Sequence, residues 1–531
     1  MPVARRRRLM WLKLGGGVLV ALFATALAVR VLAPLPPLAG RTESRAVAPT
    51  DDTRLGRAIG PVAAARPGLT GVHLLPDPHD AFAARVALAR AAERTLDLRY
   101  YIWNGDLSGL QLMTEVTRAA DRGVRVRLLI DDNTTAGLDP LLAALDSHPM
   151  IELRLFNPFT VRRVRPLAYL ADFPRLNRRM HNKSFTADGA ITVVGGRNIG
   201  DEYFGARDEG LFVDLDAVAI GAAVADVRTD FDRYWASGSA YPVGLILAPP
   251  PPGLLADVRN GRTLAGKEEL ARTYAAAIAR SGFMRAVLAR NLPIAWAPAR
   301  LLSDDPAKGL GRSSREALVW TELDQVLHSA RSSVRLVSGY FVPAEAGTAL
   351  LNSLARRGVD VQVATNSYST TDVPIVHAGY VKRRDELLQA GVTLYELASP
   401  ARAEAEDEAK SSGNAGSRFS GAGQGLHAKT FTVDGRRLFV GSFNFDPRSA
   451  ALNTEMGLVI ESPELTGVLN EGLRRRIPAG SYQVVTAPDG DLRWIIGSGN
   501  GRRVSETEPG MSTFDKFQTG ILSLLPIEWM L

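Results

Sequence analysis

Apolar and polar positions along the chain form two kinds of segment that alternate, and the same order of segments occurs twice. Short apolar runs of strand character are separated by stretches of about 10 to 15 residues with helical spacing of apolar positions. This alternation predicts βαβ units and a mostly parallel or mixed sheet in each series. The runs are LDLRYYIW (96–103), VRVRLLIDDN (124–133) and IELRLFN (151–157), then VRLVSGYFV (334–342), VDVQVATN (359–366) and VTLYELA (392–398).

The two series also agree in detail where a helix gives way to a strand. RAADRGVRVRLL (118–129) and LARRGVDVQVA (354–364) share a basic helix end, a glycine directly after the helix and then a strand. We therefore expect an α/β protein with two duplicated halves, each a mixed sheet flanked by helices. The expected divisions are an N-terminal segment (1–50), a first half (70–245), a linker or insertion (246–320) that contains the stiff proline break APPPPGLL (248–255), and a second half (321–531) with an apolar tail.

The N-terminal segment has the pattern of an export signal. Arg5 to Arg8 precede an apolar run of about 16 residues at 14–29, and prolines follow. This pattern predicts a signal peptide or a short signal anchor, and both interpretations stay open. The arginines are expected to remain in the cytoplasm, which places the rest of the chain outside. We expect residues 1–50 to lie outside the folded body.

Two further segments have alternative interpretations. The stretch 401–425 has the composition of a mobile loop and directly precedes one of the motifs described below, so it is either a lid over a site or an ordinary surface insertion. The C-terminal FDKFQTGILSLLPIEWML (514–531) is apolar and contains a tryptophan near its end. It is either a packed final helix or a segment at a bilayer interface, where tryptophan is favoured.

Composition limits the function classes. The 531 residues carry a formal net charge of +7, which indicates an anionic partner such as lipid headgroups or nucleic acid. The chain has no cysteine, which excludes disulfides and thiolate metal sites.

The strongest chemical signal is a motif that occurs twice. HNKSFTAD (181–188) and HAKTFTVD (427–434) both have the form H-x-K-x-x-x-x-D. ITVVGGRN and RLFVGSFN follow, and each ends in an asparagine 17 residues after its histidine (198 − 181 and 444 − 427). Since the chain has only 7 histidines and eight lysines, a chance match in the same register of two repeats is improbable.

This spacing suits phosphoryl transfer. In a strand, residues i and i+2 point to the same face, so His181 projects with Lys183 and His427 with Lys429. A neutral imidazole attacks phosphorus, and a second imidazolium protonates the leaving alkoxide. Lysines and asparagine amides stabilise the charge of the transition state. Because one histidine must attack while the other protonates, the two halves are expected to face each other across one cleft.

The paired motifs with trailing G-[GS]-x-N resemble the phospholipase D superfamily, from about residue 70 to the C-terminus. More narrowly, RLNRRMHNKSFTADGAITVVGGRNIGDEYFG (175–205) and SLLPIEWML (523–531) are similar to bacterial cardiolipin synthases of the C type. The resemblance implies metal-independent catalysis through a phosphohistidine, without a cofactor. It assigns catalysis to His181, Lys183, Asp188, His427, Lys429 and Asp434, with the aspartates mainly holding the turn, phosphate binding to Asn198, Asn444 and Ser442, and orientation of the histidines to Asp214 and Glu455.

Two further expectations concern which histidine attacks and how the two motifs differ. The first-motif histidine is the usual nucleophile, so His181 is favoured for that role. Gly196 stands where the second motif has Ser442, so a hydroxyl contact to phosphate is expected from one half only.

Other polar or aromatic residues are given structural interpretations. The acids of LIDDN (129–133) are expected to cap the next helix, and no metal is assigned to them. His328 and His377 lie in helix-like stretches and are interpreted as structural or surface residues. YYIW (100–103) is interpreted as a core strand, with the alternative that one aromatic residue lines a lipid entrance.

The function that follows is transfer of a phosphatidyl group through a phosphohistidine to phosphatidylglycerol, as in cardiolipin synthesis. The resemblance implies phosphatidylethanolamine as the donor. It also places the protein in the bacterial inner membrane with its catalytic domain on the periplasmic side, and we expect no nucleic acid partner. The alternatives are phospholipid hydrolysis, cleavage of nucleic acid phosphodiesters, and a non-catalytic membrane-binding module, which would have eroded motifs.

Overall fold

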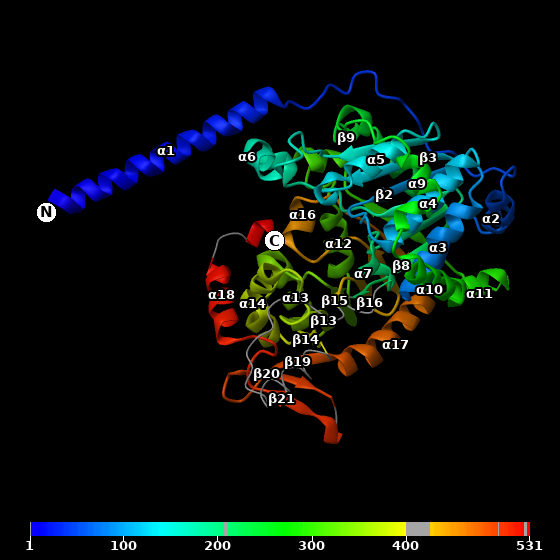
Figure 1. Ribbon diagram of the computed structural model, residues 1–531. Coiled ribbons are helices and arrows are strands. Elements are labelled where there is room, and N and C mark those ends of the chain that lie inside the picture. The colour runs from blue at the N-terminus through cyan, green and yellow to red at the C-terminus, as the bar shows by residue number, and fades with distance from the viewer. Residues whose placement is uncertain (1, 207–210, 290, 400–424, 498, 525–527) are drawn as a thin grey trace.

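Two mixed β-sheets, each flanked by helices, form the body of the protein in the computed structural model (Figure 1). The structure describes residues 2–206, 211–289, 291–399, 425–497, 499–524 and 528–531. The expected α/β architecture with two similar halves is confirmed.

The first sheet has a parallel centre and antiparallel flanks. Its strands β2, β3 and β4 pair in parallel, as the βαβ pattern predicts, and the motif strand β5 pairs antiparallel with β2. In spatial order the strands are β10 (Ala295–Ala297), β1 (Thr70–Leu75), β8 (Asp216–Gly221), β6 (Ile191–Gly195), β5 (Ser184–Ala187), β2 (Thr95–Tyr100), β3 (Arg125–Asp131), β4 (Ile151–Phe156) and β9 (Ala240–Pro242).

The second sheet repeats this plan. Its strands β12, β13 and β14 are parallel, and the motif strand β16 pairs antiparallel with β12. In spatial order the strands are β11 (Ala299–Ser303), β18 (Met456–Glu461), β17 (Arg437–Gly441), β16 (Lys429–Val433), β12 (Ser333–Ser338), β13 (Asp360–Asn366), β14 (Thr393–Leu397), β19 (Ser481–Thr486), β20 (Leu492–Ile496) and β21 (Arg503–Ser505).

Helices connect the parallel strands and cover the sheets. Those of the first half and the linker are α1 (Pro2–Leu32), α2 (Arg54–Ala64), α3 (Pro78–Ala91), α4 (Leu107–Asp121), α5 (Asp139–Asp146), α6 (Arg165–Leu176), α7 (Asp201–Phe204), α8 (Ala222–Trp235), α9 (Leu254–Arg259), α10 (Glu268–Ala279) and α11 (Gly282–Leu288). Those of the second half are α12 (Val319–His328), α13 (Ala344–Arg356), α14 (Pro374–Gln389), α16 (Pro447–Ala451), α17 (Pro463–Gly480) and α18 (Thr513–Leu524), and the short 3-10 turns include η1 (Asp132–Thr134), η4 (Pro306–Leu310) and η6 (Glu528–Met530).

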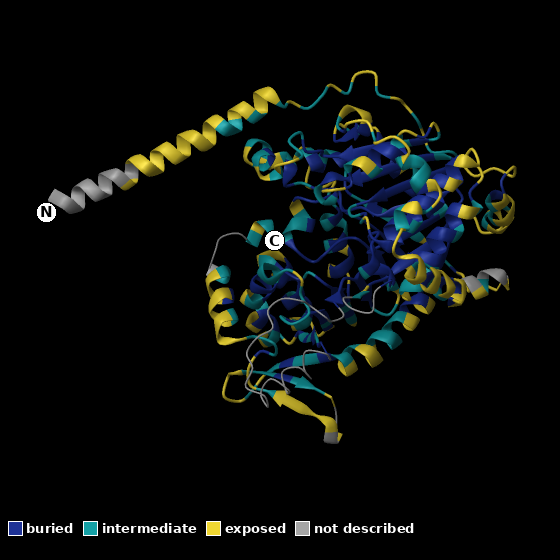
Figure 2. Ribbon diagram, viewed as in Figure 1, coloured by how far each residue is buried: buried dark blue, intermediate teal, exposed yellow. Residues whose placement is uncertain are grey.

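The two sheets meet through a shared apolar core. Val194 and Ala217 of the first sheet pack in one buried cluster with Leu438 and Leu458 of the second. Figure 2 shows that burial is continuous across the boundary between the halves. Because burying this surface favours a fixed contact, the halves are held in one orientation and can build a single site between them.

The segment 246–320 is divided between the halves. Helices α9, α10 and α11 pack against α3 and α4 of the first half. Strand β10 then joins the edge of the first sheet, and β11 joins the edge of the second sheet after a single intervening residue.

The N-terminal helix α1 projects from the body and contacts it through α6 (Figure 1). Its residues Lys13–Leu32 form, among the described residues, the one helix long and apolar enough to cross a membrane, and none of that stretch is buried.

The expectation that all of residues 1–50 lie outside the fold is wrong for residues 41–47. Arg41 donates to the carbonyl of Ser237, and the buried Arg154 donates to the carbonyl of Thr42. The backbone N–H of Ala46 donates to Asp232. The reason is that buried arginines on the first sheet need acceptors, and an extended segment supplies them through its carbonyls.

Candidate active site

The motif residues lie directly before or at the start of strands β5 and β16, at the boundary between the halves. His181, Lys183, His427 and Lys429 are all buried. In both halves the histidine backbone is fixed by the opposite half, since the N–H of His181 donates to the carbonyl of Thr454 and the N–H of His427 to that of Val213. The second contact continues the two-stranded pairing of β7 (Phe212–Val213) with β15 (Gly425–Leu426).

Each histidine is held by an acid from the other half. Nδ1 of His181 lies 2.9 Å from Oε2 of Glu455, and Nδ1 of His427 lies 2.6 Å from Oδ2 of Asp214. Both acids are completely shielded. With Nδ1 of each ring held by a carboxylate, Nε2 is the nitrogen that would act on a substrate. The sequence predicted these orienting acids, but it did not indicate that they cross between the halves.

The difference between Gly196 and Ser442 follows from the two acids. The Ser442 hydroxyl donates to Glu455 at 2.5 Å, so it supports that acid. A Cβ at Gly196 would lie 2.2 Å from Oδ1 of Asp214, closer than two such atoms can approach. The shorter aspartate therefore requires glycine. The Ser442 hydroxyl, predicted to contact phosphate, is used instead within the protein.

The two lysines have equivalent positions. Nζ of Lys183 donates to the carbonyl of His181 at 2.6 Å, and Nζ of Lys429 donates in the same way to His427. An ammonium group has three hydrogens, so each lysine keeps donors for an anion. Lys183 lies over the ring of Tyr101, and Lys429 lies over the ring of Tyr340.

The two motif asparagines differ. The side chain of Asn198 accepts from the N–H of Ile102 and donates to the hydroxyl of Tyr203, so its amide is largely engaged within the protein. The side-chain oxygen of Asn444 is buried and makes no hydrogen bond within the described structure. An amide binds phosphate through its NH2 group, not through its oxygen, so phosphate binding by Asn198 and Asn444 stays a prediction.

The motif aspartates lie at the far end of their strands from the histidines. Asp188 accepts N–H donors from Glu93, Arg94 and Thr95. Asp434 accepts equivalent donors from the segment before β12. Both have positive φ, 49° and 53°. They hold the strand turn and do not contact the histidines, as the subsidiary role predicted for them implies.

The electrostatics of the site favour an anionic substrate. Burial, with Lys183 and Lys429 nearby, holds the pKa of His181 well below its ordinary value. Burial and Lys429 lower the pKa of His427 to about 4, although Asp214 acts in the opposite direction. Burial also lowers the pKa of Lys429 to about 8 and that of Lys183 well below its ordinary value. Crowded buried cations release protons, and a bound phosphate anion reverses this effect.

The two orienting acids differ in charge state. Burial raises the pKa of Glu455 to about 7. Burial acts in the same direction on Asp214, but the contact with His427 outweighs it and holds the pKa of Asp214 below its ordinary value. Asp214 is therefore ionised at neutral pH, whereas Glu455 is partly protonated.

Sequence reasoning missed Tyr203 at the site and a buried ion pair, and it anticipated Tyr101 only as an alternative. Tyr101 lies edge-on to His181, and Tyr203 lies edge-on to His427. Tyr101 is the aromatic residue of YYIW that faces the site, and the alternative interpretation of that stretch anticipated it. Lys308 pairs with Asp304 at 2.8 Å, and Asp304 accepts the backbone N–H of Glu455. In the sequence, this lysine and this acid lie four residues apart in the expected linker, and nothing in that spacing indicates that they lie beside Glu455.

The acids of LIDDN bind arginines. Asp131 pairs with Arg179 at 2.8 Å and accepts the N–H of Asn133, while Asp132 pairs with Arg162. Within the described ranges, no group of three or more histidine or acidic side chains is arranged to hold a metal ion.

The remaining predicted features are located as follows. His328 is exposed, and His377 is buried against Glu508. All but the last residue of the predicted loop at 401–425 lies outside the described residues.

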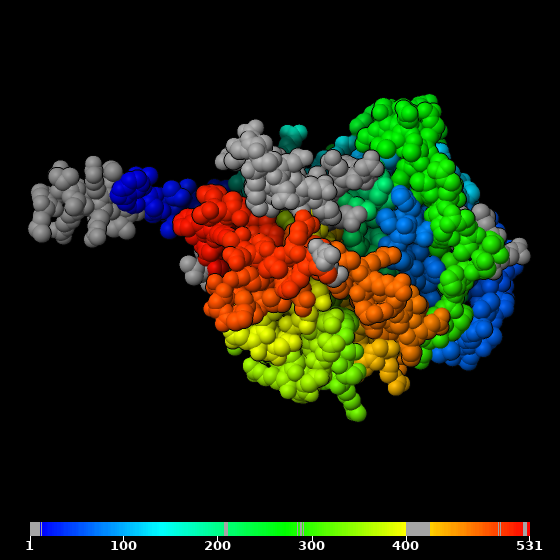
Figure 3. Space-filling model, turned by 90° about the horizontal axis from the view of Figure 1, so that it is seen from below, coloured from blue at the N-terminus to red at the C-terminus, as the bar shows by residue number. Residues whose placement is uncertain are grey.

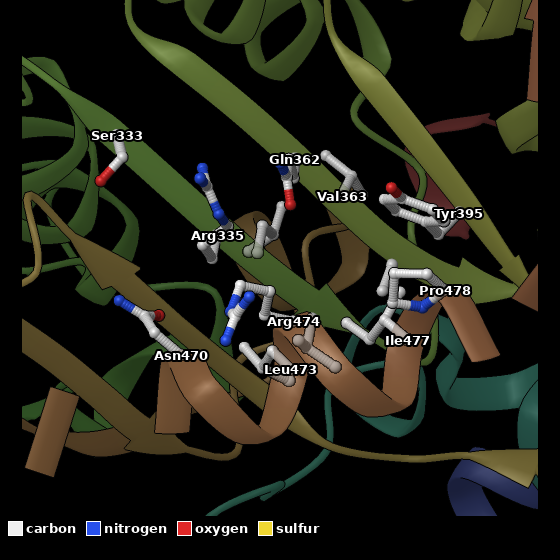
Figure 4. A pocket seen from close by; sticks show the side chains of 13 residues that line it. Ser333, Arg335, Gln362, Val363, Tyr395, Asn470, Leu473, Arg474, Ile477 and Pro478 are labelled. Atoms are coloured by element: carbon white, nitrogen blue, oxygen red, sulfur yellow. The ribbon is translucent and has the colours of Figure 1, made fainter. Parts of the chain in front are cut away.

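A cavity of about 240 Å³ lies elsewhere, between α17 and strands β12, β13 and β14 (Figure 4). Leu473 and Ile477 of α17 face Tyr395 across it. None of the motif residues lines this cavity, so it is separate from the histidine site.

Known proteins share both the sequence and the fold. Residues 86–235 and 323–477 match the family described as "Cardiolipin synthase, PLD-like domain". The chain is 46% identical to cardiolipin synthase C of Escherichia coli (strain K12) over 90% of this chain and 100% of that protein. It is 27% identical to a cardiolipin synthase of Geobacillus kaustophilus over 72% of this chain and 61% of the relative.

The fold has a solved counterpart. A phosphatidylserine synthase from Haemophilus influenzae aligns with a TM-score of 0.54 at 13% identity, covering 89% of this chain and 99% of that one. At this identity the likeness concerns the fold alone.

Proposed function

Because the chain belongs to the cardiolipin synthase family of phospholipase D-like proteins and is a phosphatidyltransferase acting on phospholipids, we propose that His181 and His427 perform the transfer in the cleft between its halves. The observation that supports this most directly is the pair of crossed contacts, His181 with Glu455 and His427 with Asp214. Each histidine thereby receives its orienting acid only when both halves are in place.

In the first step, Nε2 of His181 attacks the phosphorus of the donor phospholipid. The bond from phosphorus to the headgroup oxygen breaks, and His427 gives its proton to that oxygen, so the headgroup alcohol leaves. The phosphatidyl group is then bonded to His181. Lys183 and Lys429 stabilise the charge on the non-bridging oxygens.

In the second step, a hydroxyl of phosphatidylglycerol attacks the same phosphorus. His427, now neutral, takes the proton of that hydroxyl, and the bond between phosphorus and His181 breaks. The product is cardiolipin, and both histidines return to their starting protonation states.

The difference between the two acids supports this assignment of roles. A general acid must carry a proton, and an ionised carboxylate at Nδ1 stabilises the imidazolium form. Asp214 provides such a carboxylate to His427, and the pKa of His427, about 4 beside Lys429, must rise when the substrate phosphate offsets the charge of that lysine. Glu455, with its raised pKa, gives His181 weaker support for a positive charge, which suits a neutral nucleophile.

The proposed donor is phosphatidylethanolamine, as the resemblance to C-type cardiolipin synthases implies, and the proposed acceptor is phosphatidylglycerol. We also propose that α1 anchors the protein and that the catalytic body lies on the periplasmic side. The arginines that precede the apolar stretch support this orientation, because cytoplasmic flanks of membrane helices are rich in arginine and lysine.

The test is product analysis with the purified full-length protein. Labelled phosphatidylglycerol is supplied with and without phosphatidylethanolamine, and labelled cardiolipin is expected, with more of it when both lipids are present. Formation of phosphatidic acid alone would contradict transfer and indicate a hydrolase. His181→Ala and His427→Ala are each expected to abolish product, while His328→Ala, which changes an exposed histidine, serves as the matched control.

A further inference from the structure

Helix α18 carries an apolar stripe that faces away from the protein. Phe514, Phe517 and Ile521 are spaced three and four residues apart, so they lie on one face of the helix. Phe514 is 71% exposed and Phe517 is 66% exposed. The opposite face, which includes the buried Thr519, packs on α14. A soluble helix normally turns its apolar face inward, so this arrangement indicates a contact with an apolar environment outside the protein.

Helix α6 presents a second group of exposed apolar side chains. Val164, directly before the helix, and Leu170 and Phe173 within it are all exposed. The exposed Arg163 lies beside them, and Lys516 is exposed on α18. Apolar side chains with neighbouring cations fit a surface that is apolar below and anionic above.

The 3-10 turn η6 lies between these helices and forms a third exposed apolar group with the single side chain of Trp529, which is 55% exposed. Arg448 donates both to the carbonyl of Met530 in η6 and to the carbonyl of Asn177, directly after α6. On its other side, η6 lies close to α14, where Glu528 approaches Arg383 at 3.5 Å. Since α18 packs on α14, the three groups form one continuous side of the protein.

This side is the one from which α1 projects. Figure 1 shows α6, α18 and the C-terminus on the side of the body nearest α1, and in Figure 3, seen from below, the C-terminal segment in red again lies on the side from which α1 projects. The half-buried positions of α1, Thr25, Ala26 and Val29, lie in its last turns, and α1 packs on α6. Because α1 is the membrane-crossing candidate, the structure beside its last turns must lie near the membrane surface.

We propose that α6, α18 and η6 form a second membrane contact, with Leu170, Phe173, Phe514, Phe517, Ile521 and Trp529 inserted among the outer parts of the lipids. Weak individual contacts suffice, because α1 holds this surface at a high effective concentration near the bilayer. Tryptophan at the edge of such a surface is typical of the membrane interface.

The proposed contact lies close to the histidine site. Tyr169 of α6 donates to Asn133, and Asn133 donates to the hydroxyl of Tyr101, whose ring lies edge-on to His181. A helix that rests on the bilayer is therefore two hydrogen bonds away from the wall of the catalytic cleft.

The absence of cysteine from the chain allows a direct test. Single-cysteine variants Phe173→Cys, Phe517→Cys and Trp529→Cys of the full-length protein are labelled with a fluorophore. They are then reconstituted into vesicles of phosphatidylethanolamine and phosphatidylglycerol that contain a nitroxide-bearing lipid. Val468→Cys is the matched control, since Val468 is also apolar and 66% exposed, and its helix α17 lies away from α1, α6 and α18 in Figure 1.

Quenching by the nitroxide lipid is expected to be several-fold stronger at positions 173, 517 and 529 than at 468. Equal quenching at all four positions would overturn the proposal. Energy transfer between labelled copies, without quenching by lipid, would also overturn it and identify a protein–protein interface. Because the measurement needs no turnover, its result is independent of whether the proposed reaction is correct.

Discussion

At the scale of single residues, equivalent histidines are held by acids whose pKa values move in opposite directions. Glu455 has a pKa raised to about 7 by burial, while contact with His427 keeps Asp214 ionised. Pairs of titratable groups with diverging pKa values are typical of sites that separate an acid from a nucleophile. The pseudo-symmetric site thus has two chemically distinct sides.

The raised pKa of Glu455 predicts that activity and stability oppose each other. The pKa of this carboxyl is about 7 in the folded protein and 4.5 ordinarily, so the folded protein binds more protons between these values. The contribution of Glu455 to stability is therefore fully present below about pH 4.5 and is lost as the pH rises through 7. Glu455→Gln removes this loss. We expect a free energy of unfolding higher by up to about 3 kcal/mol at pH 7.5, with lower activity.

Denaturant unfolding at pH 5 and pH 7.5 measures the effect, and the gain should be small at pH 5. A variant that is less stable than the original protein at pH 7.5 would show that the ionised carboxylate is favourable in the folded state.

The pKa of Lys429, about 8, predicts an alkaline limit to activity. As the pH rises above about 8, this ammonium loses its proton and no longer stabilises the phosphate charge, so kcat/KM is expected to fall. Lys429→Arg, which stays protonated, is expected to be less active at neutral pH but to retain its residual activity at higher pH. A pH profile of kcat/KM for both proteins is the measurement, and identical alkaline limits would assign that limit to another group.

The contact between Gly196 and Asp214 predicts an asymmetric pair of substitutions. Gly196→Ser introduces a Cβ that would lie 2.2 Å from Oδ1 of Asp214, so Asp214 must move and His427 loses its orientation. Activity is expected to fall about 100-fold, the effect of a misplacement of about 1 Å. Ser442→Gly, the reverse change in the other half, is expected to cost less, because Glu455 keeps its contact with His181. Comparing kcat of the two variants tests this, and equal losses would contradict it.

At the scale of elements, an extended segment before the first half supplies backbone carbonyls as hydrogen-bond acceptors to the first sheet. Residues 41–47 supply acceptors to Arg154, Arg127 and Arg125, which face α8 and its surroundings. Arg127 and Arg154 also stack on Trp235 of that helix. The strand registers show that Gln362 and Tyr395 of the second half are equivalent to Arg127 and Arg154 of the first. In the second half these two residues line the cavity of Figure 4.

Truncation should separate the anchor from this structural segment. A protein that lacks residues 1–36 is expected to keep the stability of the body, because the contacts of 41–47 remain. One that lacks residues 1–50 leaves buried arginine donors without acceptors, and each such group costs about 1–3 kcal/mol. Thermal unfolding of both truncated proteins in detergent is the measurement. Equal midpoints would show that water replaces the lost acceptors.

At the scale of the whole molecule, the shared core and the crossed acids make one site from two halves of one chain. A mixture of the His181→Ala and His427→Ala proteins is therefore expected to recover no activity, since each molecule builds its site from its own two halves. Product formation by the mixture, compared with each variant alone, is the measurement. Recovery in the mixture would show that halves are exchanged between chains.

The sequence by itself determined the chemistry and the plan of the fold. The repeated H-x-K motifs and the βαβ pattern in both halves were predictable, because they depend on local spacing and on periodicity that the strands enforce. The two orienting acids were assigned through the family resemblance that these motifs carry. The apolar N-terminal helix was predictable for the same reason, since its length and composition are local properties.

The tertiary structure alone decided which partner each residue has. Asp214 and His427 are 213 residues apart, and nothing local indicates that an acid serves the opposite half. The role of Ser442, the engagement of Asn198 and the packing of residues 41–47 likewise depend on which surfaces meet when the sheets dock. The register of a strand decides to which face of its own sheet each side chain points. The orientation of one half relative to the other depends on the burial of the shared core.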